Sequence, residues 1–342
     1  MGFDFNQTSR RSVLKGMAGG AGALALGFTP AASQSGTKAI FIEPFDLILE
    51  FMPELNAAAG GHFKAQGLDI DIINARGTSL AVQQLIAKQA LFTKLGVLDL
   101  IKAYAQQQIP IVSVATVQQS AIFNVVSLKS APIMNPADMK GKTIGVASLG
   151  GGTENNLDLM LASAGIPKQD VPRQAVGLSP GNVELLKQGR VAAFFATIEV
   201  SVALQRANEP VEIWNIDRFA PIPGGAYVVT REVSEKQPEI IVKFLRAIHA
   251  SVNELLTGDL NKILDRAERQ FEITGNKSRE FRLDALKAYN ALIVAKGKEN
   301  ILRNIPAVWQ ASAALTQKAG VATVSNIDDL YTNRFLDQAA KT

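Results

Sequence analysis

The chain has 342 residues, no cysteine, two histidines and a formal net charge of +4. Without cysteine it cannot form a disulfide, a thiolate metal site or a thiol nucleophile. His62 and His249 stand alone and far apart in the sequence, so no metal and no cofactor is predicted. The small net charge and the absence of a lysine or arginine run argue against a nucleic-acid partner.

The amino terminus has the pattern of an export signal. Residues 9–15 read SRRSVLK and resemble the twin-arginine export consensus, with Val13 where a phenylalanine is usual. Uncharged residues follow over 16–29, and small residues over 30–33. We expect residues 1–33 to be a twin-arginine (Tat) signal peptide, cleaved between about 31 and 36, that sends the chain to the periplasm.

A membrane anchor is the alternative interpretation of this stretch. Spanning the hydrocarbon core takes about 20 mostly apolar residues, whereas the uncharged run here is shorter and rich in glycine. The pattern therefore favours a cleaved signal.

Short apolar stretches alternate with helical patterns through the first third of the chain. Predicted strands cover 38–42, 68–73, 90–95 and 110–117, and predicted helices cover 47–59, 80–89 and 97–105. In the second of these helices Val82, Leu85 and Ile86 recur at helical spacing. This alternation indicates βαβ units on a mostly parallel sheet.

The alternation breaks once and then resumes. Residues 121–128 form a second apolar run with almost no helix between them and the strand at 110–117. Later predicted strands cover 143–147, 191–197, 211–216 and 226–230, later predicted helices cover 154–164 and 182–188, and the chain reads as helical from about residue 235.

The break predicts that the chain crosses between two lobes near residue 119 and returns near residue 224. Lobe one would comprise 37–119 and 225–342, and lobe two 120–224, each of ordinary domain size. The predicted fold class is therefore α/β, with two lobes that each hold a mostly parallel sheet flanked by helices, joined by two hinge crossings.

Four segments carry a family resemblance: GHFKAQGLDIDI, GTSLAVQQLIAKQALFTKLGVLDLIKA, MKGKTIGVASLGGGTENNLDLMLASAGI and VELLKQGRVAAFFATIEV. In this order and spacing they resemble the type II periplasmic binding proteins of ABC importers, in the branch that binds sulfonate, taurine, nitrate or thiamine pyrimidines. The resemblance implies a two-lobed solute-binding protein that serves a permease in the inner membrane. In that branch the loop after the first strand often carries a tyrosine or a proline-rich ligand contact. Here the loop reads Glu43-Pro44-Phe45-Asp46 instead, so the resemblance implies no ligand contact at this position.

Two loops have the chemistry of a ligand site. The segments 76–79 (RGTS) and 148–153 (SLGGGT) each join a strand to a helix, where free N–H groups and glycine allow a close approach to a ligand. We expect Thr153 to cap its helix as well. The predicted ligand contacts are Phe45, Arg76, Thr78, Ser79, Leu95, Gly96, Gln119, Ser148, Gly150, Gly151, Gly152, Thr153, Thr197 and Glu199.

The sequence alone does not determine the sign of the ligand's charge. Helix amino termini favour an anion, by about 0.3–1 kcal/mol each. The acidic candidates Glu43, Asp46, Glu154 and Glu199 nevertheless outnumber the basic candidates Arg76 and Lys94. Sulfonate, nitrate, carboxylate and aromatic acids therefore compete with a pyrimidine or another amine-bearing heterocycle. The aromatic residues Phe123, Trp214, Phe219 and Tyr227 are expected mainly in the core.

Other classes of function fit the sequence less well. An enzyme is disfavoured because cysteine is absent and the histidines are scattered. A ligand-sensing subunit for a membrane receptor remains an alternative to transport. The predicted partners are a small-molecule solute, the ABC permease and the Tat machinery, and the chain is expected to be a monomer.

Overall fold

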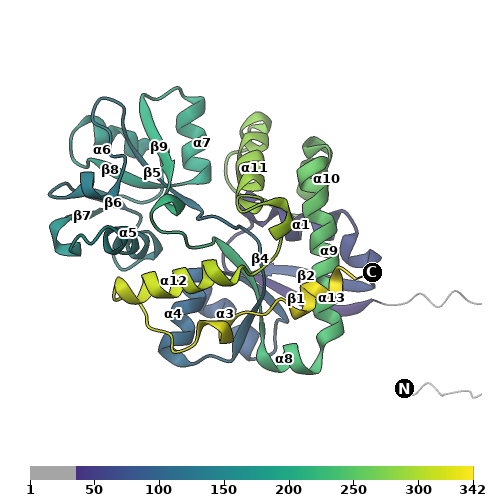
Figure 1. The fold of residues 1–342 in the computed structure, drawn as a ribbon. Coiled ribbons are helices and arrows are strands. Elements are labelled where there is room, and N and C mark those ends of the chain that lie inside the picture. Colours follow the sequence, from purple (N-terminus) through teal and green to yellow (C-terminus); the bar gives the residue numbers. More distant parts are fainter. Residues whose placement is uncertain (1–35, 342) are drawn as a thin grey trace, which may run out of the picture. The chain divides into compact units, whose positions relative to one another are not determined.

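The computed structural model describes residues 36–341, so the predicted signal peptide lies outside the described residues. Two five-stranded sheets form its framework (Figure 1). Within the described part of the chain, no helix is both long and apolar enough to cross a membrane.

The first sheet combines strands from the start of the chain with one later strand. Its order is β2-β1-β3-β10-β4, with β1 at Thr37–Glu43, β2 at Leu68–Asn74, β3 at Phe92–Gly96, β4 at Ile111–Thr116 and β10 at Gly225–Thr230. β1 pairs in parallel with β2 and β3, whereas β10 runs antiparallel to β3 and β4.

The second sheet is built from the middle of the chain. Its order is β7-β6-β8-β5-β9, with β5 at Phe123–Leu128, β6 at Ile144–Val146, β7 at Arg173–Ala175, β8 at Ala193–Thr197 and β9 at Val211–Asn215. β6 pairs in parallel with β7 and β8, and β5 runs antiparallel to β8 and β9. In each sheet the antiparallel strand is therefore the one that the chain enters after a crossing.

Helices cover both sheets. They are α1 (Met52–Ala59), α2 (His62–Ala65), α3 (Thr78–Ile86), α4 (Val97–Gln107), α5 (Gly152–Ser163), α6 (Val183–Lys187), α7 (Ile198–Arg206), α8 (Arg231–Lys236), α9 (Pro238–Thr257), α10 (Leu260–Gln270), α11 (Arg279–Ile293), α12 (Pro306–Lys318) and α13 (Arg334–Ala339). Between β1 and α1 lies one 3₁₀ turn, η1 (Leu49–Phe51).

Phe244 on α9 joins that helix to the first sheet. Its ring stacks on Phe92 at 4.1 Å, on Phe63 at 5.7 Å and on Phe41 at 5.8 Å between centroids, and it meets Tyr227 edge-on at 5.2 Å. All five side chains are buried. Aromatic pairs of this kind add about 0.5–1.5 kcal/mol beyond the area they bury, so α9 holds the first sheet firmly.

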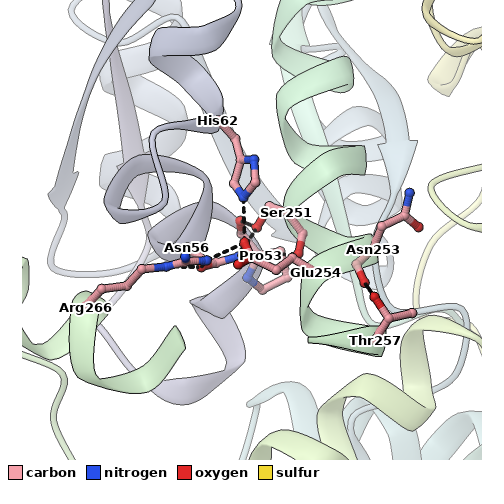
Figure 2. Close-up of polar contacts among 8 residues, drawn as sticks. All are labelled: Pro53, Asn56, His62, Ser251, Asn253, Glu254, Thr257 and Arg266. Atoms are coloured by element: carbon pink, nitrogen blue, oxygen red, sulfur yellow. Dashed lines mark hydrogen bonds and ion pairs between the residues drawn. The ribbon is translucent and has the colours of Figure 1, made fainter. Parts of the chain in front are cut away.

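A polar network ties four helices together over the same region. Asn56 on α1 donates to Ser251 Oγ on α9 at 3.0 Å and accepts from Arg266 Nε on α10 at 3.0 Å (Figure 2). Glu254 on α9 pairs with Arg266 and lies 2.8 Å from Nε2 of His62 on α2. Burial raises the pKa of Glu254, but the hydrogen bonds from Arg266 and His62 outweigh burial and lower it.

The predicted fold class is confirmed, and the sheets are mixed rather than purely parallel. The predicted strands match observed ones to within two residues at each end. The sequence analysis missed β7, which has three residues, and α7, whose first turn Thr197 caps by accepting from the Val200 N–H at 3.2 Å. Because Ser35–Thr342 cluster into one compact unit, the division into two lobes stays a prediction.

Candidate functional site

Loops at the carboxyl ends of strands from both sheets surround a cleft of about 550 Å³. Pro44 and Phe45 follow β1, Val97 follows β3, and Ser148 follows β6. In open α/β sheets this edge is where ligands bind, because helix amino termini present free N–H groups there. The position of the cleft therefore favours a ligand site.

The two crossings also line this cleft and hydrogen-bond to each other. The Gly224 N–H donates to the Gln118 carbonyl at 3.0 Å, and the Val117 N–H donates to the Gly225 carbonyl at 2.8 Å. A Cβ added to Gly224 would lie 2.5 Å from Cγ2 of Ile122, and one on Gly225 would lie 2.5 Å from Oε1 of Gln118. Glycine is therefore required for the two crossings to lie this close.

The structure brings part of the predicted site together. The predicted contacts that line the cleft are Phe45, Thr78, Leu95, Gly96, Ser148, Gly152 and Thr153. They come from loops of both sheets, as the sequence analysis expected.

The other predicted contacts do not line it. They are Arg76, Ser79, Gly150, Gly151, Gln119, Thr197 and Glu199. The side chains of Arg76 and Ser79 are exposed beside the start of α3. Gly150 and Gly151 shape the loop instead, and a Cβ on Gly151 would clash with Oγ of Ser148.

Gln119 lies in the first crossing and holds it to the chain between α11 and α12. It is buried, and its Nε2 donates to the carbonyls of Asn300 and Arg303, at 2.9 Å each, and of Thr116 at 3.2 Å. These bonds use its donor capacity and turn the amide away from the cleft.

Glu199 joins α7 to α11. Its Oε2 accepts from the Tyr289 hydroxyl at 2.5 Å, and Arg206 and Asp284 form a second link between the same helices at 2.6 Å. Burial, and then the charge of Glu199, raise the pKa of Tyr289 well above its usual value. Tyr289 therefore stays a donor at neutral pH.

Thr153 does not cap α5, contrary to the sequence expectation. The N-cap residue of α5 is Gly151, which has no side chain that could cap the helix. Thr153 lies one residue inside the helix, and its Oγ1 accepts from the N–H of Ala147 at 2.8 Å. This bond holds the end of β6 against the start of α5.

Several cleft residues were missed by sequence reasoning. Glu50 and Phe51 lie in η1, inside a stretch predicted as continuous helix, and Asp99 lies in the first turn of α4. Phe123 lines the cleft, whereas Trp214 and Tyr227 are buried in the core. The sequence patterns around these residues did not indicate which of their side chains would face the cleft.

A buried ion pair forms the floor of the cleft. Lys94 Nζ lies 2.8 Å from Oε1 of Glu54, donates to the Glu50 carbonyl at 3.1 Å and sits 4.3 Å from the ring centroid of Phe51. Burial lowers the pKa of Lys94, but Glu54 and its neighbouring carboxylates outweigh burial and raise it. Lys94 is therefore charged, and its charge is already neutralised.

Glu43 is a neighbour of this pair and is fully buried. Neither of its carboxyl oxygens has a hydrogen-bond donor among the described residues, and the carboxylate of Glu54 is its neighbour. Burial and then the charge of Glu54 raise the pKa of Glu43 well above its usual value. Burial therefore favours the protonated form of Glu43, and the Tyr227 hydroxyl completes the cluster by donating to Glu54 at 2.7 Å.

Two acidic side chains, Glu50 and Asp99, belong to the lining of the cleft. The Glu50 carboxylate is 4.0 Å from Lys94 Nζ and keeps 15% of its side chain exposed. Burial raises the pKa of Glu50, and Lys94 opposes it. Burial likewise raises the pKa of Asp99.

A larger hollow of about 880 Å³ lies elsewhere, at the amino ends of β1 and β2, where Thr37 and Leu68 begin these strands. Its lining includes no residue of the second sheet. Because sheets of this kind bind ligands at the carboxyl edge, the smaller cleft is the better candidate.

The fold is the one found in periplasmic binding proteins. The chain belongs to the NMT1/THI5-like family, whose model matches residues 49–257. No protein of curated function matches the chain in sequence.

Solved structures share the fold at low identity. The periplasmic sulfonate-binding protein SsuA from Methylobacillus flagellatus KT superposes with a TM-score of 0.64 at 17% identity, over 90% of this chain and 94% of that one. The aliphatic sulphonate-binding SsuA of Escherichia coli gives 0.64 at 15%, over 84% and 92%. The desulfurization enzyme DSZB gives 0.59 at 11%, over 88% and 99%.

Proposed function

We propose that this chain is the solute-binding component of an ABC-type importer, and that it captures a small solute in the cleft between the two sheets. The observation that carries the proposal is that loops from both sheets, together with both crossings, line one cleft of about 550 Å³. A solute held there contacts loops of both sheets at once, and it therefore stabilises the conformation in which these loops are closest together.

The comparisons support a binding protein over an enzyme. Two of the similar structures carry names of sulfonate-binding proteins, although DSZB shows that the fold also serves catalysis. In the cleft, the described lining holds no histidine, and His62 belongs to the helix network of Figure 2. Within residues 36–341 no group of three acidic or histidine side chains is placed to hold a metal.

The export signal sets the place and the partners. Export by the twin-arginine route puts the chain in the periplasm, where a monomer would deliver its solute to a permease in the inner membrane. The solute classes open to it are the sulfonate, nitrate, carboxylate and aromatic acids of the resemblance, or an amine-bearing heterocycle such as a pyrimidine. Sensing for a membrane receptor would use the same binding event.

Closure on a ligand tests this function. A thermal-shift screen of sulfonates, carboxylates, nitrate, pyrimidines and amines on the purified chain should yield at least one compound that raises the melting temperature. At saturation, at about 100 times its Kd, that compound should stabilise the chain by about 2.7 kcal/mol and reduce the radius of gyration in small-angle scattering.

The two readouts separate binding from mechanism. If a compound that saturates the chain by calorimetry leaves the scattering curve unchanged, capture by closure is wrong. If the compound is turned over to a product, the chain is an enzyme of this fold.

A further inference from the structure

The charges that line the cleft are unbalanced towards the negative. Its charged side chains are Glu50, Asp99 and Lys94. Lys94 is only 2% exposed and already pairs with Glu54 at 2.8 Å, so it has no free charge to offer a ligand. The lining therefore holds two acidic side chains and one cation, and that cation makes its closest ion pair with Glu54.

The helix amino termini at the cleft are partly neutralised by the chain itself. Asp99 occupies the first turn of α4, and Glu154 occupies the first turn of α5, where its Oε2 accepts from the Gly150 N–H at 2.5 Å. Only α3 lacks an acidic residue in its first turn among these three, and the exposed Arg76 beside it does not line the cleft. An anionic ligand would find little positive charge that is not already paired.

The remaining lining is largely apolar. Phe45 and Leu178 belong to it and are 54% and 44% exposed, from loops that follow β1 and β7. Deeper in the cleft lie Phe51, Phe123 and Ile222. Exposed apolar side chains that face one cleft from two sides indicate an apolar ligand surface.

Glu50 is the group placed to meet a polar end of such a ligand. Its main-chain carbonyl takes the hydrogen bond from Lys94, while its carboxylate is partly exposed and lies 4.0 Å from Lys94 Nζ, a longer contact than the 2.8 Å pair of Lys94 with Glu54. Within the described part of the chain no side chain donates a hydrogen bond to this carboxylate. A carboxylate in such a site gains most from a ligand that brings its own positive charge and donors.

We propose that the cleft selects an organic cation, a protonated amine or amidine carried on an apolar body, and that the Glu50 carboxylate binds its charged group. This rests on the proposed function, because it assigns a ligand class to the same cleft. It departs from the sulfonates named for the similar structures, which bind through an anionic group.

Matched probes test the ligand class by calorimetry on the purified chain. Phenethylamine and benzylamine supply the cation, benzyl alcohol is the neutral analogue, and benzenesulfonate and phenylacetate are the anions. We expect the amines to bind at least tenfold more tightly than the anions. Glu50→Gln should weaken amine binding at least tenfold and leave benzyl alcohol unchanged.

Asp46→Asn is the control, because Asp46 is exposed on the same loop, bonds to Asn74 at 2.9 Å and does not line the cleft. It should bind amines as the unaltered chain does. Tighter binding of benzenesulfonate than of the amines, failure of both amines to bind, or equal amine affinity in Glu50→Gln would each overturn the ligand class. A sulfonate that binds and closes the chain would leave the proposed function standing, whereas a bound probe without closure would count against that function instead.

Discussion

At the scale of single residues, the cluster under the cleft is unusual because it buries more acid than base. Glu43 and Glu54 are both fully buried, and Lys94 and the Tyr227 hydroxyl both contact Glu54. Removing charges from water costs several kcal/mol per ion unless they are paired. A protonated Glu43 avoids that cost, which is why its pKa is raised first by burial and then by Glu54.

This protonation predicts how stability depends on pH. Because the pKa of Glu43 is higher in the folded chain than its usual 4.5, its contribution to stability is fully present below that pH and is lost as the pH rises through the folded pKa. Glu43→Gln keeps the neutral form at every pH. We expect it to match the parent melting temperature near pH 5 and to exceed it by several degrees near pH 8, as followed by circular dichroism.

Asp46→Asn serves as the reference for this comparison, since its carboxylate is exposed. A difference between Glu43→Gln and the parent that is the same at both pH values would mean that Glu43 is ionised in the folded chain.

At the scale of elements, the network of Figure 2 holds α1, α2, α9 and α10 together. Asn56 is its centre, because it is fully buried and both donates and accepts across helix boundaries. Removing it would leave the Ser251 hydroxyl and the Arg266 guanidinium short of a partner. Buried groups left unsatisfied cost about 1–3 kcal/mol each.

Asn56→Ala should therefore lower the free energy of unfolding by about 2–4 kcal/mol in urea titration. Asn253→Ala is the matched control, with the same change on an exposed face of α9. It should shift stability by less than about 0.5 kcal/mol. Equal losses for the two variants would show that the network does not hold the helices.

At the scale of the whole molecule, the contacts that connect the segments predicted as lobes include the two crossings and a link between helices. The crossings hydrogen-bond side by side at Gly224 and Gly225, and α7 meets α11 through Glu199 and Tyr289. Glu199 was predicted to contact the ligand, whereas the structure uses it in this link. Closure of the cleft would therefore have to bend the crossings. It would also have to move α7 and α11 together, or else break the hydrogen bond between Tyr289 and Glu199.

Export is the other property of the whole molecule. Lysine is a poor substitute where two neighbouring guanidinium groups are recognised, because its ammonium group lacks the planar, forked geometry of arginine. Replacing Arg10 and Arg11 together by lysine should retain the uncleaved precursor in the cytoplasm, as seen by fractionation and immunoblotting. An unchanged periplasmic yield would point to a different export route.

The α/β fold class and nearly all strand positions could be predicted from the sequence, and so could the loops after β1, β3 and β6, which line the cleft. The hydrophobic periodicity, the positions of glycine and the order of the segments can all be determined from the sequence without a structure. Arg76 and Gln119 were predicted ligand contacts, and the structure places neither of them in the lining of the cleft. A residue at the end of a strand can turn towards the cleft or away from it, and only packing decides which.

Glu50 is the clearest case of what the tertiary structure decided. Its sequence neighbours predict an ordinary helix, and nothing local distinguishes it from an exposed glutamate. Its carboxylate lines the cleft at 4.0 Å from Lys94 Nζ, because the closer ion pair of Lys94, at 2.8 Å, is with Glu54. The charge that a ligand meets depends on which groups are already paired, and pairing is set by contacts between residues distant in sequence.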